Sequence, residues 1–110
     1  MYVYDEANKL AKSIIESREY IEYKKAKEEL KSNIEMKDKI EEFENIRKEV
    51  QVLSFQGKEQ DENKMQKMQE LYQILVQDKQ IKEFFDIEVR FNIMIADINK
   101  IISESIEDVL

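Results

Sequence analysis

Apolar residues recur every three or four positions along most of this chain, and the longest such run extends from Asp78 to Val109. Its apolar members are Ile81, Phe84, Phe91, Ile95, Ile98, Ile102 and Val109. This spacing places them on one stripe of a helix. Such a helix would be about 48 Å long, against a diameter of about 34 Å for a compact chain of this length. Part of the stripe should therefore overhang and need another helix, from the same chain or from a second copy, to cover it.

Shorter patterns precede this run. A first helix is expected from about Asp5 to Glu16, with Asp5 as its N-cap. A second segment has Tyr20, Tyr23, Ala26, Lys27 and Leu30 on one side. Ser17 lies between the two and can cap a new helix, so the sequence allows one bent helix or two.

A third helix is expected from about Ile34 to Gln56, after the capping candidates Ser32 and Asn33. Its apolar positions are Met36, Ile40, Phe43, Ile46, Val50 and Leu53. Gly57, the only glycine, can adopt the positive φ that often ends a helix.

The stretch Lys58 to Asn63 has no apolar residue and is predicted to be a loop, with Asp61 as the next cap. A fourth helix then carries Met65, Met68, Leu71, Tyr72 and Leu75 and ends near Val76, before Asp78 caps the final helix. Short connections make successive helices antiparallel neighbours. We therefore expect a helical hairpin that turns between Gly57 and Asn63, with the third and final helices as its long arms.

Composition supports an all-α fold. The chain has one glycine, no proline and 39% charged residues, which is typical of long helices or coiled coils. Its 110 residues suffice for one domain, covering residues 1–110. The predicted fold is an all-α, long antiparallel helical hairpin with shorter N-terminal helices that forms a coiled-coil-like oligomer. We expect a homodimer or a higher even-numbered oligomer.

The residue types argue against an enzyme. Histidine and cysteine are absent, which removes the commonest general base and the commonest transition-metal ligands. A single glycine cannot build a phosphate-binding loop. The remaining carboxylates, such as Glu41, Glu42, Glu44 and Glu49, lie among lysines and arginines at the spacing of ordinary helical ion pairs. We therefore predict no catalytic residue, no cofactor and no metal site.

Charge and hydropathy limit the partners. With 18 Lys plus Arg against 25 Asp plus Glu, the net charge is −7, which should repel a nucleic-acid backbone. The densest basic run, Lys24, Lys25 and Lys27, is surrounded by glutamates. No uncharged run reaches the roughly 20 residues that a membrane helix needs. We expect a soluble, cytoplasmic protein that binds neither nucleic acid directly nor a membrane.

The final helix also carries polar residues beside its stripe. Glu88 and Asn92 flank Phe91, and Asn99 follows Asn92 by seven residues. These residues are either solvated at the border of the stripe or hydrogen-bonded across an interface whose register they fix. The candidate interface consists of Phe84, Glu88, Phe91, Asn92, Ile95, Ile98 and Ile102. Alternatively, the third helix buries this stripe inside the monomer.

The whole pattern resembles the YlbF/YmcA/YheA family of small bacterial helical proteins, also called the control-of-competence regulator family. The resemblance rests on positions throughout the chain: Ala7, Leu10, Ala11, Ile14, Ser17, Tyr20, Lys24, Ala26, Phe43, Gly57, Met68, Gln69, Leu71, Ile81, Glu88, Phe91, Asn92 and the run from Asp97 to Ile102. It implies an all-α protein that assembles with itself or with relatives. Some members act in a cytoplasmic complex that adjusts RNA processing through the endoribonuclease RNase Y, with effects on competence, sporulation and biofilm formation.

Those members carry cysteines that hold iron-sulfur clusters, and this chain has none. It is more similar to the YheA-type branch, so the cluster is not expected here. The resemblance implies a non-enzymatic regulatory adaptor whose partners are itself, family paralogues or an RNA-decay complex. The alternative is a structural coiled-coil spacer or holdase, which Met65 and Met68 near the hairpin end would suit.

Overall fold

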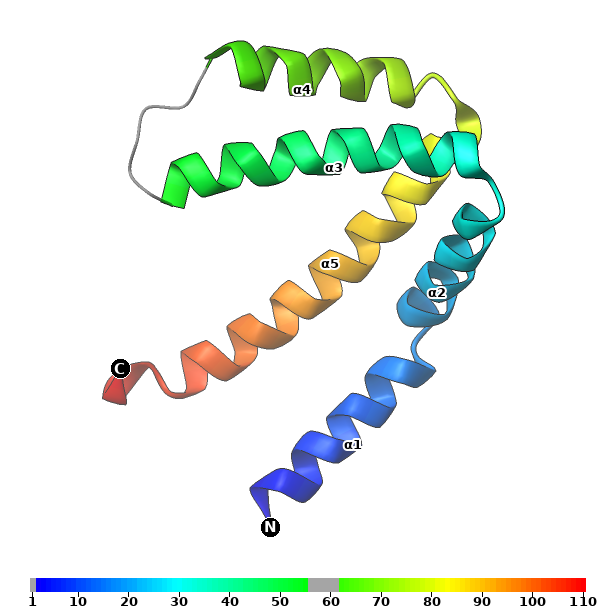
Figure 1. The fold of residues 1–110 in the computed structure, drawn as a ribbon. Coiled ribbons are helices and arrows are strands. Elements are labelled where there is room, and N and C mark those ends of the chain that lie inside the picture. The colour runs from blue at the N-terminus through cyan, green and yellow to red at the C-terminus, as the bar shows by residue number, and fades with distance from the viewer. Residues whose placement is uncertain (1, 56–61) are drawn as a thin grey trace. The chain divides into compact units, whose positions relative to one another are not determined.

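The computed structural model describes residues 2–55 and 62–110, and their regular secondary structure is entirely helical (Figure 1). The elements are α1 (Val3–Glu16), α2 (Arg18–Lys31), α3 (Ile34–Phe55), α4 (Glu62–Leu75), α5 (Lys79–Ser105) and the short 3-10 helix η1 (Glu107–Val109). The prediction of an all-α fold is confirmed. None of the helices in the described ranges combines the length and apolarity that crossing a bilayer requires.

Three short polar side chains define where helices begin. Ser17 adopts an extended backbone with φ −70° and ψ 151°, and its Oγ accepts a hydrogen bond of 3.2 Å from the Tyr20 backbone N–H. Asn33 Oδ1 accepts one of 3.1 Å from the N–H of Met36. Asp78 Oδ1 accepts one of 2.9 Å from the N–H of Gln80. Because Ser17 interrupts the helical backbone, the N-terminal segment is two helices.

Some predicted boundaries differ from the structure. Asp5 is not a cap, because α1 begins two residues earlier, after Tyr2, which makes no side-chain capping bond. The final helix ends at Ser105, and 27 residues give it a length of about 40 Å. Helix α4 already begins at Glu62, so the predicted loop is shorter at that end. The predicted helix stop at Gly57 and cap at Asp61 lie outside the described residues.

The described chain divides into two compact units. Helices α3 and α4 form a hairpin within the unit Glu29–Glu83, here called unit 2 (Figure 1). The Phe43 and Tyr72 rings lie 5.7 Å apart, and Lys64 Nζ lies 3.4 Å from Glu49 Oε2. These pairings run in opposite directions along the two helices, so the arms are antiparallel. Among the residues of this unit whose burial the structure describes, the buried apolar ones are Ile40, Phe43, Val50, Leu75 and Ile81.

The predicted hairpin is therefore present, but its second arm was assigned to the wrong helix. Helix α3 pairs with α4, which follows it directly in the sequence, rather than with the longer final helix. The apolar positions of α4 are spaced at three and four residues, so this helix can cover α3 as soon as the chain turns back.

The other compact unit, here called unit 1, comprises Met1–Glu28 and Phe84–Leu110. It contains α1, most of α2 and most of α5. Tyr20 contacts Phe91 and Tyr23 contacts Phe84, so α2 runs antiparallel to α5. That residues 1–110 form a single domain stays a prediction.

Candidate interaction site

The predicted interface residues all lie on α5 in unit 1, and α2 covers the first of them. The Tyr23 ring lies 6.1 Å from Phe84 and 5.0 Å from Phe91, and the Tyr20 ring lies 6.3 Å from Phe91. These centroid distances are within the range of favourable aromatic pairs. The N-terminal part of the stripe is therefore packed within the chain itself.

Glu88 takes part in the same contact. Its side chain is 5% exposed, and its Oε2 accepts a hydrogen bond of 3.0 Å from the Tyr23 hydroxyl. A buried carboxylate needs such donors, and a phenol aimed at one fixes how α2 sits along α5. The Lys27 ammonium lies 4.9 Å from the Tyr23 ring centroid, on its face. Glu88 thus connects α5 to α2 within unit 1, and the role of Glu88, Asn92 and Asn99 across an interface stays a prediction.

The rest of the predicted interface is more open. Ile95 and Ile98 are only partly buried, and Ile102 and Asn92 are exposed. The residues Phe84, Glu88, Phe91, Ile95, Ile98 and Ile102 follow one heptad pattern, which we call the front face of α5. Tyr20 and Tyr23 contact this face up to Phe91. Its C-terminal half remains available to another helix.

Helix α1 is the second open element of unit 1. None of its residues is buried, although Val3, Ala7, Leu10, Ala11 and Ile14 share one side of the helix. Its charged residues occupy the opposite side. The apolar spacing was visible in the sequence, but only the structure shows that unit 1 buries no residue of this stripe fully and leaves Ile14 half-buried. We call this stripe and the C-terminal half of the front face the open faces of unit 1.

Charged side chains surround the α2 contact. Arg18 Nε lies 2.7 Å from Glu22 Oε1, and Arg90 Nη2 lies 3.9 Å from Glu22 Oε2. The hydrogen bond from Arg18 lowers the pKa of Glu22, an effect that the charges of Arg18 and Arg90 reinforce and partial desolvation opposes. The same hydrogen bond raises the pKa of Arg18. These exposed ion pairs contribute little to stability.

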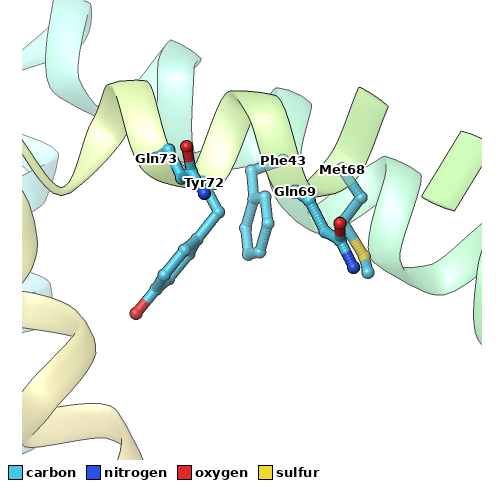
Figure 2. Close-up of a pocket in the computed structure, with 5 residues that line it drawn as sticks. All are labelled: Phe43, Met68, Gln69, Tyr72 and Gln73. Carbon is cyan, nitrogen blue, oxygen red and sulfur yellow. The ribbon is translucent and has the colours of Figure 1, made fainter. Parts of the chain in front are cut away.

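Unit 2 carries a shallow apolar groove of about 260 Å³, lined by Phe43, Met68, Gln69, Tyr72 and Gln73. Figure 2 shows the Phe43 ring of α3 between Tyr72 and Met68 of α4. Met68 therefore packs beside the hairpin contact, as an ordinary core residue does. In the part of the chain that the structure describes, no group of three or more acidic side chains is arranged to hold a metal ion.

Comparisons with known proteins found a matching family model, similar proteins and a solved structure with a similar fold. The family model described as "Control of competence regulator ComK, YlbF/YmcA" matches residues 3–107. A UPF0342 protein of Alkalihalophilus pseudofirmus is 36% identical over 107 residues, which cover 97% of this chain and 91% of the relative. Another from Caldicellulosiruptor bescii is 35% identical over 105 residues, covering 96% and 88%. A solved structure, "Protein of Unknown Function (DUF964) from Bacillus stearothermophilus", superposes with a TM-score of 0.81 at 16% identity, covering 97% of this chain and 94% of the other, and supports the fold alone.

Proposed function

Because the chain belongs to the family described as control of competence regulator ComK, YlbF/YmcA, we propose that it is a non-enzymatic regulatory adaptor that acts through helix-mediated association. Its partners are a second copy of itself and related family proteins, in a cytoplasmic assembly that controls RNA processing. The family resemblance inferred from the sequence is confirmed. The regulatory description belongs to the family, and the adaptor mechanism is our proposal for this chain.

The open faces of unit 1 are the observation that supports this proposal. A strongly amphipathic helix gains most of its stability by burying its apolar side against another element. Helix α1 buries none of its residues, and the front face of α5 has exposed or half-buried isoleucines beyond Phe91. Apolar surfaces of this kind mark sites of protein association.

The proposed mechanism follows from this geometry. The α2 tyrosines hold the N-terminal part of the front face, and the half-buried Ile95 and Ile98 and the exposed Ile102 continue the same heptad pattern. A helix from a partner can therefore extend the existing α2–α5 packing along α5 without rearranging it. An adaptor of this kind contributes no chemistry and brings other proteins together.

The first test is the mass of the assembly. Ile98→Glu places a charge in the front face and should lower the particle mass measured by light scattering below that of the wild type; a monomer has a mass of 13.3 kDa. Ile101→Glu makes the same change at an exposed position beside the stripe, and it should keep the wild-type mass. A wild-type protein that is monomeric at micromolar concentration would contradict the proposal.

The second test links assembly to regulation. In cells that lack the gene, the wild-type protein and the Ile101→Glu variant should restore the levels of competence-regulator transcripts, and Ile98→Glu should fail to do so. Circular dichroism should show equal helix content for the two variants. Full restoration by a monomeric Ile98→Glu variant would mean that association is not how the protein acts.

A further inference from the structure

Helix α5 carries a second, smaller apolar stripe on the side opposite its front face. Val89, Ile93 and Ala96 are spaced four and three residues apart, which aligns them along the helix. Val89 is 52% exposed and Ile93 is 54% exposed, and Ala96 is exposed as well. Helix α2 packs on the other side of α5, through Phe84 and Phe91. We call Val89, Ile93 and Ala96 the rear face.

The polar residues that border the rear face are self-complementary. Arg90 and Asp97 lie along one edge, and Asn92 and Asn99 lie along the other. Each pair is separated by seven residues, so its members occupy the same heptad position in successive heptads. One edge therefore carries opposite charges one heptad apart, and the other carries two amides with the same spacing.

This arrangement points to an antiparallel pair of α5 helices. With Ile93 at heptad position a and Ala96 at d, an antiparallel second helix places its Ala96 against Ile93. The same alignment places Arg90 opposite Asp97 of the second copy and Asn92 opposite Asn99, and towards the helix ends it places Glu83 opposite Glu104. Because the pair has two-fold symmetry, each of these contacts occurs twice. A parallel pair would bring the edges together without any contact between opposite charges.

We propose that the rear face is an interface at which α5 pairs antiparallel with α5 of a second copy of this chain. Its apolar centre is formed by Ile93 and Ala96, and Val89 packs against the aliphatic stem of Lys100 of the second copy. Two Arg90–Asp97 ion pairs and two Asn92–Asn99 amide contacts fix the register. This interface is distinct from the front face, and its existence does not rest on the proposed function.

A groove of about 430 Å³ borders the rear face at Ile93 and is lined by Glu19, Arg90, Ile93, Met94, Asp97 and Ile98. Arg90 and Asp97, which would form the ion pairs, both lie along this groove. The Arg90 guanidinium is 3.9 Å from Glu22 and remains largely exposed, so it can receive a second carboxylate.

The small size of the rear face limits the expected affinity of the α5–α5 pair. Three apolar residues per helix make a small interface, of the class below about 1,200 Å² in total that gives weak association. Its charged edge is solvent-exposed and therefore screened by salt. We expect a dissociation constant in the micromolar range.

A charge-swap series tests the ion pairs, with dissociation constants measured by analytical ultracentrifugation. Asp97→Arg would bring arginine against Arg90 of the second copy, and it should raise the dissociation constant of the rear interface at least about tenfold. The double variant Arg90→Asp/Asp97→Arg restores opposite charges and should recover most of that loss. Asp108→Arg is the control, because it makes the same charge change outside α5.

Two outcomes of this series would overturn the proposal. The first is a double variant that associates no better than Asp97→Arg alone. The second is a control that weakens association as much as Asp97→Arg does, because the effect would then come from net charge.

Cysteine cross-linking tests the antiparallel register, and the chain has no cysteine of its own. Isotopically labelled Ile93→Cys and unlabelled Ala96→Cys proteins are mixed and oxidised, and the products are identified by mass. Antiparallel pairing should give mixed disulfide dimers well above their statistical share. A predominance of Ile93→Cys homodimers would show parallel pairing, and the absence of cross-links would show that the rear faces do not meet. Either result would overturn the inference.

The same assay separates this inference from the proposed function. When Ile102→Glu is added to both cysteine variants, it changes the front face outside the groove beside Ile93, so the mixed cross-link should persist. If cross-linking persists and the protein with the front-face change still restores the transcript levels in cells, the rear interface stands and the adaptor proposal fails. If the response requires Ile98 but no mixed cross-link forms, the adaptor proposal stands and the rear interface fails.

Discussion

The two units of this protein differ in how far they bury their apolar residues. In unit 2, α3 and α4 pack against each other, and Ile40, Phe43 and Leu75 are buried within the chain. In unit 1, α1 buries nothing, and α5 has exposed apolar residues on both its front and rear faces. Unit 2 therefore has a hairpin core of its own, whereas in the described part of unit 1 the buried apolar residues are Phe84 and Phe85 at the start of its part of α5 and the apolar stripe of α1 has none. Stability should depend mainly on unit 2 and association mainly on unit 1.

The largest effect should come from the hairpin core of unit 2. Ile40 is 2% exposed, and Ile40→Ala should lower the free energy of unfolding by about 2 to 5 kcal/mol. Ile34→Ala is the matched control, because Ile34 lies on the same helix but is 71% exposed, and it should change stability by less than about 0.5 kcal/mol. Urea denaturation monitored by circular dichroism measures both. Equal effects would show that α3 is not buried as described.

The next effect concerns the contact between α2 and α5. Tyr23→Phe keeps the ring and removes the hydroxyl that donates to Glu88. Because hydrogen bonds to charged groups contribute about 1.5 to 3 kcal/mol, this variant should lower the free energy of unfolding by about that amount. Tyr4→Phe makes the same change at an exposed position on α1 and should be neutral. The measurement is again the free energy of unfolding. If Tyr23→Phe is also neutral, then the hydrogen bond does not hold α2 on α5.

A smaller effect on stability, but a clear one on association, is expected from α1. Leu10→Ala shortens a side chain that is 37% exposed, so the unfolding free energy of the monomer should fall by less than the about 2 to 5 kcal/mol expected for a fully buried residue. If α1 belongs to an interface, the dissociation constant should rise about tenfold, which corresponds to 1.4 kcal/mol. Sedimentation at several concentrations provides the readout. A lower monomer stability with an unchanged dissociation constant would show that α1 contributes to the stability of the monomer and not to an interface.

The smallest effect is the pH dependence of the Glu22 ion pairs. The folded state lowers the pKa of Glu22, chiefly through the hydrogen bond from Arg18, so ionised Glu22 favours folding above its unfolded pKa. This contribution is lost as the pH falls through the lowered folded pKa. The difference in melting temperature between wild type and Glu22→Gln should therefore be present at neutral pH and vanish in strong acid. A difference that grows on acidification would contradict the assigned direction.

Local features of the sequence were sufficient to predict most helix limits. Ser17, Asn33 and Asp78 accept hydrogen bonds from backbone N–H groups two or three residues later, and such caps depend only on neighbouring residues. The same local pattern failed at Asp5, because helix α1 extends to Val3 without a side-chain cap. The three-and-four spacing likewise predicted which side of each helix is apolar.

The candidate site was predicted less completely. The sequence identified the front face of α5 and the unusual position of Glu88, but not that Tyr23 would donate to it from 65 residues away. It also did not separate the rear face from scattered exposed residues, although Val89, Ile93 and Ala96 follow a helical spacing that could have indicated it.

The sequence alone thus determined that this protein is helical, where most helices begin, and which residues are available for burial, because backbone capping and helical periodicity act over a few residues. Only the tertiary structure decided that α3 pairs with α4 and that the α2 tyrosines pack on Phe84 and Phe91 of α5. The physical reason is that amphipathic helices carry similar stripes, and any of them can cover any other. Which ones meet depends on the lengths of the connections and on a few specific contacts, such as Tyr23 with Glu88, that no local pattern encodes.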